Sequence, residues 1–222
     1  MSPQTPSSPR KPPTKSDRPT QLSARGTRTR ELILRAAIEV FGRQGFADAT
    51  MLHIAQEAGV ASGTVYQYFS DKADVFRYLL RDLERKLHRE TRMPAGSDGR
   101  LVVRDSVLRY LAVYREHEAL FRAWWELLEP PTEFTDAWVA LHRKSHGELR
   151  AVVEQGQRDG TIARTVDADI AAELIVAMFE RPAYLRIILG WDSSLTDDEF
   201  AGALEHLLRG GLLPGLAAGL TV

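Results

Sequence analysis

Hydroxyl, amide and aromatic side chains are interleaved over one short stretch of the chain, AGVASGTVYQYFSDK, residues 58–72. A fully buried helix has no use for Ser62, Thr64 and Gln67 between its apolar positions, and a fully solvated helix does not need three aromatic rings within four residues. Tyrosine and threonine hydroxyls can bind phosphate oxygens, and a threonine methyl group can contact a thymine methyl group in the major groove. This stretch therefore favours contact with DNA along one face and packing along the other.

The spacing within the stretch separates these two faces. On a helix that begins near Ser62, a residue that commonly caps helices, Val65 and Phe69 are four residues apart and share the inward face. Gly63 leaves the start of the helix bare, so another surface can approach the backbone, and the amide groups of the first turn can bind a phosphate oxygen. Lys72 follows the helix and offers a positive charge to a DNA backbone. The outward side carries Gly63, Thr64 and Gln67, with Tyr66 and Tyr68 on the flanks.

A purely structural role is the alternative for the two tyrosines. Tyr66 and Tyr68 could pack against neighbouring helices, since a tyrosine ring can pack while its hydroxyl reaches solvent. A turn, a bare helix start, flanking hydroxyls and a basic N-terminal segment occur together here, and this combination favours DNA binding.

Signs of metal binding or catalysis are weak. His142 and His146 are four residues apart on a predicted helix and could form a two-ligand metal face. The glutamate of an HExxH motif and an obvious third ligand are both missing, so we expect no metal and no cofactor. A phosphate-binding glycine loop and a nucleophile elbow are also missing, and we therefore expect no enzymatic activity.

The apolar residues recur at helical spacing, with breaks at turn compositions. Order is predicted to begin near Thr27, and Gly42 and Gly45 close the first helix. Thr50 is the expected cap of a short second helix over about residues 51–58, and Gly59 is expected to take a positive φ at its end. Later helices are predicted over about residues 71–91, 101–114, 118–128, 135–158, 167–189 and 196–208. No alternating strand pattern is present, so the predicted fold class is all-α.

Two local signals refine these helices. Thr196 and Glu199 form a capping-box pattern at the start of the last one. Pro182 removes a backbone hydrogen bond, so a kink or a helix end is expected there.

The N-terminal segment differs in composition from the rest. Met1 to about Ala24 holds six of the eleven prolines and hardly an aliphatic residue, so we expect residues 1–24 to be a disordered arm. Residues 1–30 contain seven basic residues and one acidic residue, although the whole chain has a net charge of −1. A basic arm on an acidic body suggests a polyanionic partner, and the alternative is a tail that only aids solubility.

Composition also limits the cell compartment. The chain has no cysteine, which excludes disulfides and cysteine-based zinc sites. It has no uncharged run near the roughly 18 apolar residues of a membrane span, and no apolar segment follows the basic N-terminus as in a secretory signal. We expect a soluble cytoplasmic protein with no membrane partner.

A short helix, a glycine-containing turn and a second short helix form the helix-turn-helix pattern. The segment RELILRAAIEVFGRQGF…ATMLHIAQEAGVASGTVYQYFSDKADVF resembles the N-terminal domain of the TetR family of bacterial transcriptional repressors. The resemblance covers residues 29–76, about a fifth of the chain, and its most specific element is the spacing AGV-x-x-GT-x-Y-x-YF-x-x-K. The remainder is similar to the family only in the number and layout of its helices.

This resemblance implies a domain organisation and a DNA-binding site. Residues 25–72 would form an N-terminal three-helix helix-turn-helix domain, joined to a larger C-terminal helical bundle, residues 73–222, for effector binding and dimerisation. Leu52 and His53 lie where the family frequently has charged or polar residues. His53 is therefore explained as well by a surface or capping role as by a DNA contact. The family's DNA-contacting positions are occupied by Thr50, Ser62, Gly63, Thr64, Tyr66, Gln67, Tyr68 and Lys72.

The resemblance also implies an effector pocket among the middle helices. Trp124 and Trp125 are adjacent and cannot face the same way, so one is expected to line an interior and the other a helix interface. Apolar linings are usual for ligand sites, which favours a hydrophobic or amphipathic effector, although ordinary core aromatics are the alternative for each residue. The candidate effector residues are Phe121, Trp124, Trp125, Trp138, Leu141, Phe179 and Tyr184.

The leading hypothesis is a ligand-responsive transcriptional regulator, most simply a repressor that a small hydrophobic effector releases from a palindromic operator. The alternatives are an effector-independent DNA-binding protein and an enzyme with an accessory DNA-binding domain. A two-fold homodimer would place two recognition helices in successive major grooves, about 34–36 Å apart. Its expected interface residues are Ile170, Leu174, Met178, Leu185, Phe200, Leu204, Leu207 and Leu208.

Overall fold

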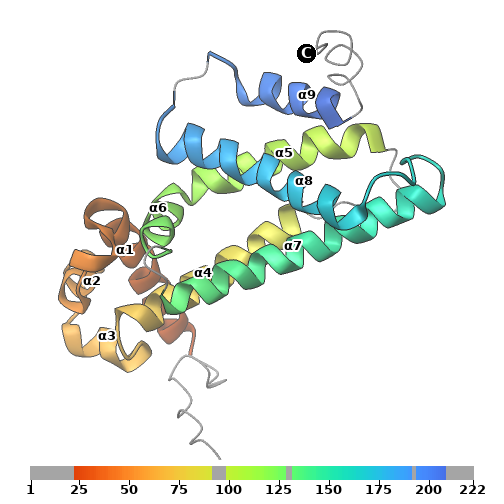
Figure 1. The fold of residues 1–222 in the computed structure, drawn as a ribbon. Coiled ribbons are helices and arrows are strands. Elements are labelled where there is room, and N and C mark those ends of the chain that lie inside the picture. The colour runs from red at the N-terminus through yellow and green to blue at the C-terminus, as the bar shows by residue number, and fades with distance from the viewer. Residues whose placement is uncertain (1–22, 92–98, 129–131, 192–193, 209–222) are drawn as a thin grey trace, which may run out of the picture. The chain divides into compact units, whose positions relative to one another are not determined.

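The computed structural model describes residues 23–91, 99–128, 132–191 and 194–208, and its regular elements there are all helical (Figure 1). The all-α prediction is thus confirmed. The chain divides into two compact units, Met1–Leu79 and Leu80–Val222. Helix α4, Lys72–Thr91, begins in the first unit and continues into the second.

The first unit is built from α1 (Ala24–Asp48), α2 (Met51–Glu57), α3 (Ser62–Tyr68) and the start of α4. The Ser23 hydroxyl accepts a hydrogen bond from the Gly26 amide at 3.2 Å, so α1 begins three residues before the predicted start at Thr27. Of the predicted disordered arm, residues 1–22 lie outside the described part of the chain. Gly42 stays inside α1, while Gly45 bends the helix with a φ of 75°.

Local signals around the turn behave largely as predicted. The Thr50 hydroxyl accepts from the His53 amide at 3.1 Å and caps α2, and Gly59 has a φ of 65°. Helix α3 begins at Ser62, as predicted, although Ser62 is not its cap. The capping position falls on Ala61, whose side chain carries no hydrogen-bonding group, and Ser62 is the first helical residue.

The core of the first unit joins all four helices. Ile33 and Phe41 of α1, Ile54 of α2 and Val65 of α3 are buried, together with Phe76 of α4. The rings of Phe41 and Phe76 meet edge to face with centroids 5.3 Å apart, a favourable geometry for aromatic pairs. The core therefore fixes α3 through its inward residues, while Tyr66 and Gln67 on its other side stay exposed.

In the part of the second unit that the structure describes, the chain continues with five α-helices and one short π-helix. Within it, α7 packs along α8, and α5 packs against both α8 and α9 (Figure 1). Among the described residues, none of the helices is both long enough and apolar enough to cross a lipid bilayer. The elements are α5 (Gly99–Glu116), α6 (Glu118–Glu126), α7 (Glu133–Arg158), α8 (Ala168–Ala183), η2 (Tyr184–Ile188) and α9 (Asp197–Leu208).

Helix α8 changes its hydrogen bonding just beyond Pro182. The α-helix ends at Ala183 and the chain continues as the π-helix η2, in which the Leu189 amide donates to the Tyr184 carbonyl at 3.1 Å. Pro182 cannot donate the hydrogen bond that its position in the last turn requires, so a change of geometry near it is expected. The predicted break therefore takes the form of a wider helical turn.

The predicted capping box of the last helix is present. The Thr196 amide donates to the Glu199 carboxylate at 2.8 Å, and the Glu199 amide donates to the Thr196 hydroxyl at 3.2 Å. Two helix-end amides are satisfied reciprocally, which starts α9 at Asp197.

Candidate functional site

Helix α3 presents one buried face and one open face. Val65 and Phe69 are both 0% exposed, which confirms the inward face predicted from their spacing. On the other side, Tyr66 is 48% exposed and Gln67 is also exposed. Thr64, Ser62 and Tyr68 are half-buried. A phenol, an amide and hydroxyl groups are thus displayed on a helix that the core holds from behind.

Gly63 lies on the open side of α3 and has no structural need to be glycine. A Cβ atom built at this position meets nothing within 4 Å, and Gly63 is not among the glycines with a positive φ. Glycine is a poor helix former relative to alanine, so Gly63 lowers the stability of the helix, and no contact inside the unit requires a glycine there. The bare backbone is useful only to something that approaches from outside.

At the start of α2, a side-chain network fixes the orientation of His53. The Gln44 Nε2 atom donates to the Asp48 carbonyl at 3.2 Å and lies 2.6 Å from His53 Nδ1. Because the amide nitrogen is a donor, Nδ1 accepts and the proton of the neutral ring lies on Nε2. The neighbouring Leu52 is largely exposed, so α2 presents an aliphatic side chain at this position.

Lys72 has a different environment from the one predicted. Its ammonium group donates to the carbonyl oxygens of Phe46, Ala47 and Ala49 at 2.8, 2.7 and 2.9 Å. An ammonium group has three donors, and all three are used here to satisfy the end of α1. A cation at a helix C-terminus is also favoured by the helix dipole. Lys72 thus fastens α4 to α1 and has no donor left for a phosphate in this arrangement.

The start of α4 is satisfied by two aspartates. Asp71 accepts from the Asp74 amide at 2.6 Å, and the buried Asp74 accepts from both the amide and the hydroxyl of Ser70. These bonds fix the chain between α3 and α4, and they place both carboxylates at the positive end of the helix as predicted.

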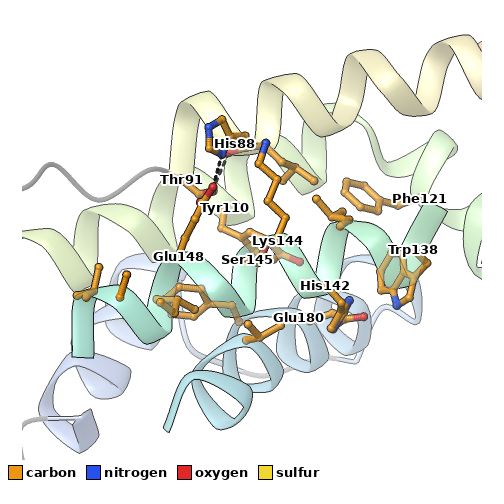
Figure 2. Close-up of a pocket in the computed structure, with 17 residues that line it drawn as sticks. His88, Thr91, Tyr110, Phe121, Trp138, His142, Lys144, Ser145, Glu148 and Glu180 are labelled. Carbon is orange, nitrogen blue, oxygen red and sulfur yellow. Dashed lines mark hydrogen bonds and ion pairs between the residues drawn. The ribbon is translucent and has the colours of Figure 1, made fainter. Parts of the chain in front are cut away.

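The second unit contains a cavity of about 450 Å³ between its helices (Figure 2). Helix α7 supplies most of the lining, and α4, α5, α6 and α8 supply the rest. The lining residues are Leu87, His88, Thr91, Tyr110, Phe121, Trp138, Leu141, His142, Lys144, Ser145, Glu148, Leu149, Ala151, Val152, Val176, Phe179 and Glu180.

The predicted effector residues divide into two groups. Phe121, Trp138, Leu141 and Phe179 line the cavity, while Trp124, Trp125 and Tyr184 do not. The three rings that do not line the cavity belong to an aromatic cluster beside it. In this cluster the centroid of the Trp125 ring lies 4.8 Å from that of Trp138 and 4.5 Å from that of Tyr184.

The two adjacent tryptophans face different surroundings, as predicted, but neither faces the cavity. Trp124 is fully buried and its indole nitrogen donates to the Phe134 carbonyl at 3.2 Å. Trp125 is half-buried and donates to the Tyr114 hydroxyl at 2.5 Å. Both indole nitrogens are satisfied within the protein, so both rings serve the packing of α6.

The polar part of the lining was not predicted from the sequence. Aromatic character does not indicate its polar residues, which include His88, Thr91, Lys144, Ser145 and Glu148. On α7, helical spacing predicts Ser145 and Glu148 but not Lys144, because lining positions recur there every three or four residues. That series is Trp138, Leu141, His142, Ser145, Glu148, Leu149 and Val152.

Two histidine–glutamate pairs control the charge of the cavity. His88 Nδ1 lies 3.0 Å from a Glu148 oxygen, and His142 Nε2 lies 2.7 Å from a Glu180 oxygen. The hydrogen bond to Glu180 raises the pKa of His142, which favours its imidazolium form. Each lining carboxylate therefore already has a partner.

His146, the second histidine of the possible metal face, does not share a partner with His142. His146 Nε2 lies 3.1 Å from the Asp169 carbonyl oxygen, whereas His142 pairs with Glu180. Each histidine thus contacts its own partner on α8.

Comparison with known proteins adds an independent line of evidence. A family model described as bacterial regulatory proteins, tetR family, matches residues 33–79. The HTH-type transcriptional regulator SrpR of Pseudomonas putida is 42% identical over 67 residues, which are 30% of this chain and only 32% of that relative.

Solved structures extend the likeness to both units. The fatty acid degradation regulator FadR from Bacillus halodurans has a TM-score of 0.69 at 22% identity, over 83% of this chain and 96% of that chain. FadR from Bacillus subtilis, solved in complex with stearoyl-CoA, has a TM-score of 0.66 at 18% identity, over 82% and 98%. At these identities the structures show a common fold. Residues 33–79 thus match the DNA-binding domain model of the tetR family of bacterial regulatory proteins, and the likeness beyond them is one of fold.

Proposed function

We propose that this protein is a ligand-responsive DNA-binding transcriptional regulator, and that it acts as a repressor which a small hydrophobic or amphipathic effector releases from a palindromic operator. The observation that carries the DNA-binding part is the open face of α3, with an exposed Tyr66 and a glycine that nothing inside the unit requires. The TetR family resemblance and the regulator names of the relatives support the same conclusion. The names of these relatives give no support to an enzymatic role.

The DNA contacts would come from the side chains on the open side of α3 and from the capped start of α2. Tyr66 and Gln67 can donate to phosphate oxygens or base edges, and Gly63 allows the helix backbone to approach the groove. The Thr50 hydroxyl accepts from the His53 amide, which leaves its own proton for a phosphate oxygen. Ser62, Thr64 and Tyr68 complete the proposed contact set. Lys72 would act as a positioning residue for this surface, because its ammonium group binds the end of α1.

The test is a pair of glycine substitutions measured on an operator obtained by binding-site selection. Gly63→Ala should raise the free energy of unfolding by up to about 1 kcal/mol and yet weaken operator binding, because the new methyl group faces the DNA. Gly147→Ala on α7 is the matched control, since its Cβ also meets nothing within 4 Å, and it should leave operator affinity unchanged. Tyr66→Ala should cost about 1–3 kcal/mol of specific binding. Full operator affinity in both Gly63→Ala and Tyr66→Ala would reject the assignment of α3.

A two-fold homodimer would supply the second DNA-binding unit. Ile170 and Leu174 on α8 are 59% and 57% exposed, and Leu207 and Leu208 at the end of α9 are exposed as well. Symmetric dimers commonly bury such apolar surface, whereas Leu204 is already used in the core of the protomer. Sedimentation at micromolar concentration should give a dimer that Leu174→Glu weakens. A monomeric wild type would exclude this arrangement.

The proposed release mechanism uses α4. This helix begins in the DNA-binding unit, and its residues Leu87, His88 and Thr91 line the cavity in the second unit. A ligand that displaces this end of α4 could change the spacing of the two recognition helices. The usual coupling is about 1–3 kcal/mol, or roughly 5- to 150-fold, and it is reciprocal. Operator DNA should therefore weaken effector binding by the same factor in calorimetric titrations. Equal effector affinity with and without DNA would show that the cavity is not coupled to DNA binding.

A further inference from the structure

The side chains around the cavity in the second unit separate an aromatic end from a polar end. Phe121 and Trp138 lie at one end in Figure 2, and His88, Thr91 and Glu148 lie at the other. Phe121 is almost fully buried, whereas Lys144 and Glu148 are exposed. An apolar body would therefore be covered at the first end, and a polar head would remain near solvent at the second.

Most polar groups of the lining are already engaged. The Thr91 hydroxyl donates to the Leu87 carbonyl at 2.7 Å. The carboxylates of Glu148 and Glu180 are paired with His88 and His142, as described above. Each carboxylate thus already has a histidine on one of its oxygens, so neither is an unpartnered negative charge for a cationic ligand.

The polar groups that remain are hydrogen-bond donors. Among the described residues, Lys144 forms no ion pair, and the side-chain hydroxyls of Ser145 and Tyr110 form no hydrogen bond. Lys144 is close enough to Glu84 of α4 to lower the pKa of that carboxyl, although burial outweighs this effect and the pKa is raised overall. Burial also raises the pKa of Tyr110, which keeps its hydroxyl protonated and able to donate. An ammonium and two hydroxyls are thus available to one ligand head.

We propose that the cavity binds an amphipathic organic acid, with its carboxylate at Lys144 and Ser145 and its apolar body against Phe121 and Trp138. A carboxylate only accepts hydrogen bonds, so it matches an ammonium, which only donates, beside hydroxyls that are able to donate. Hydrogen bonds between an ammonium and a carboxylate are among the stronger ones in proteins. The inference rests on the proposed effector role of this cavity and specifies the charge of the effector.

The experiment compares ligands that differ only in the head group, on the full-length protein. Decanoate, decanol and decylammonium form one set, and 2-naphthoate, 2-naphthol and 2-naphthylmethylammonium form a second set for a bulkier body. Binding is measured by calorimetry below the micellar concentration of each ligand. In at least one set the acid should bind more tightly than the alcohol and the amine.

The decisive variant is Lys144→Gln, and Arg143→Gln is its control. Arg143 is exposed, lies one residue away on α7 and does not line the cavity, so both variants change the net charge of the chain equally. Lys144→Gln should weaken binding of the acid about tenfold or more and leave the alcohol unchanged, because one charge-assisted hydrogen bond is lost. Arg143→Gln should bind all ligands as the wild type does.

Three results would overturn the inference. The first is an amine that binds as tightly as the acid, the second is an equal loss of acid and alcohol binding in Lys144→Gln, and the third is an equal effect of the two variants. If the alcohol or the amine binds best and still releases operator DNA, the proposed regulator function stands and the charge preference is wrong. If no ligand in either set binds, the inference is wrong, and the effector role of the cavity loses its support while DNA binding by α3 is unaffected.

Discussion

The two units differ in the length of chain that supplies each candidate site. The open face of α3 lies within residues 62–68, and one short helix carries it. The cavity lining runs from Leu87 to Glu180 and draws on five helices. A site within one helix is specified by spacing along a single segment, whereas a site among several helices depends on how they pack. The two units can therefore be tested separately, beginning with the packing of the second.

The largest expected effect is in the core of the second unit. Trp124→Ala removes a fully buried ring and its hydrogen bond to the Phe134 carbonyl, so the free energy of unfolding should fall by about 3–5 kcal/mol. Trp191→Ala is the control, because this ring is 64% exposed and its loss should change stability by less than about 0.5 kcal/mol. Urea unfolding followed by circular dichroism measures both. Similar losses in the two variants would mean that Trp124 does not carry the packing of α6.

In the first unit, the largest effect should come from Lys72. Lys72→Met keeps the aliphatic stem and removes the three hydrogen bonds to the end of α1, so the free energy of unfolding should fall by about 2 kcal/mol. Arg25→Met, at an exposed position of α1, is the control for the loss of one charge. If Lys72 instead serves only as a phosphate contact, Lys72→Met will not change the free energy of unfolding. The slope of the logarithm of DNA affinity against the logarithm of salt concentration will then become shallower by about one.

Lys72 also shows where prediction from sequence stops. The sequence shows the position of Lys72 after α3 and its charge. Its hydrogen-bond partners are carbonyl groups more than twenty residues earlier, and no local sequence pattern predicts them. By contrast, the inward face of α3, the cap at Thr50 and the positive φ of Gly59 follow from residues within one or two turns. Local signals of this kind explain why the element boundaries of both units agree closely with expectation.

The cavity lining in the second unit likewise could be predicted only in part from the sequence. Aromatic character identified Phe121 and Trp138 as lining residues, but it also selected Trp124 and Trp125, whose indole nitrogens are satisfied by backbone and side-chain partners inside the protein. Adjacent helical residues point about 100° apart, so which of them faces a cavity depends on the rotation of the helix against its neighbours. That rotation is a tertiary property.

A smaller effect is expected at the turn between α2 and α3. Gly59→Ala forces a Cβ into a conformation with a φ of 65°, which should lower the free energy of unfolding by about 1–2 kcal/mol although nothing lies within 4 Å of the new atom. Gly63→Ala, four residues later, should have the opposite sign because its backbone is helical. Chemical denaturation of both variants checks the pair. Equal changes would show that the conformation of the turn does not distinguish the two glycines.

The smallest expected effect is a pH dependence of opposite sign at two histidines of the second unit. The hydrogen bond to Glu180 raises the pKa of His142 above 6.5, so its folded form binds more protons than the unfolded chain. Its stabilisation is complete below pH 6.5 and is lost as the pH rises through the folded-state pKa. Burial, with the nearby Lys86, lowers the pKa of His117, so its unfolded form binds more protons and stability rises as the pH approaches 6.5 from below. His142→Gln should therefore flatten the fall in urea midpoint above pH 6.5, and His117→Gln should flatten the rise below it. If His142→Gln leaves the fall above pH 6.5 unchanged, the hydrogen bond to Glu180 does not raise the pKa of His142 in the folded protein. A positively charged His142 in the cavity lining would then be contradicted.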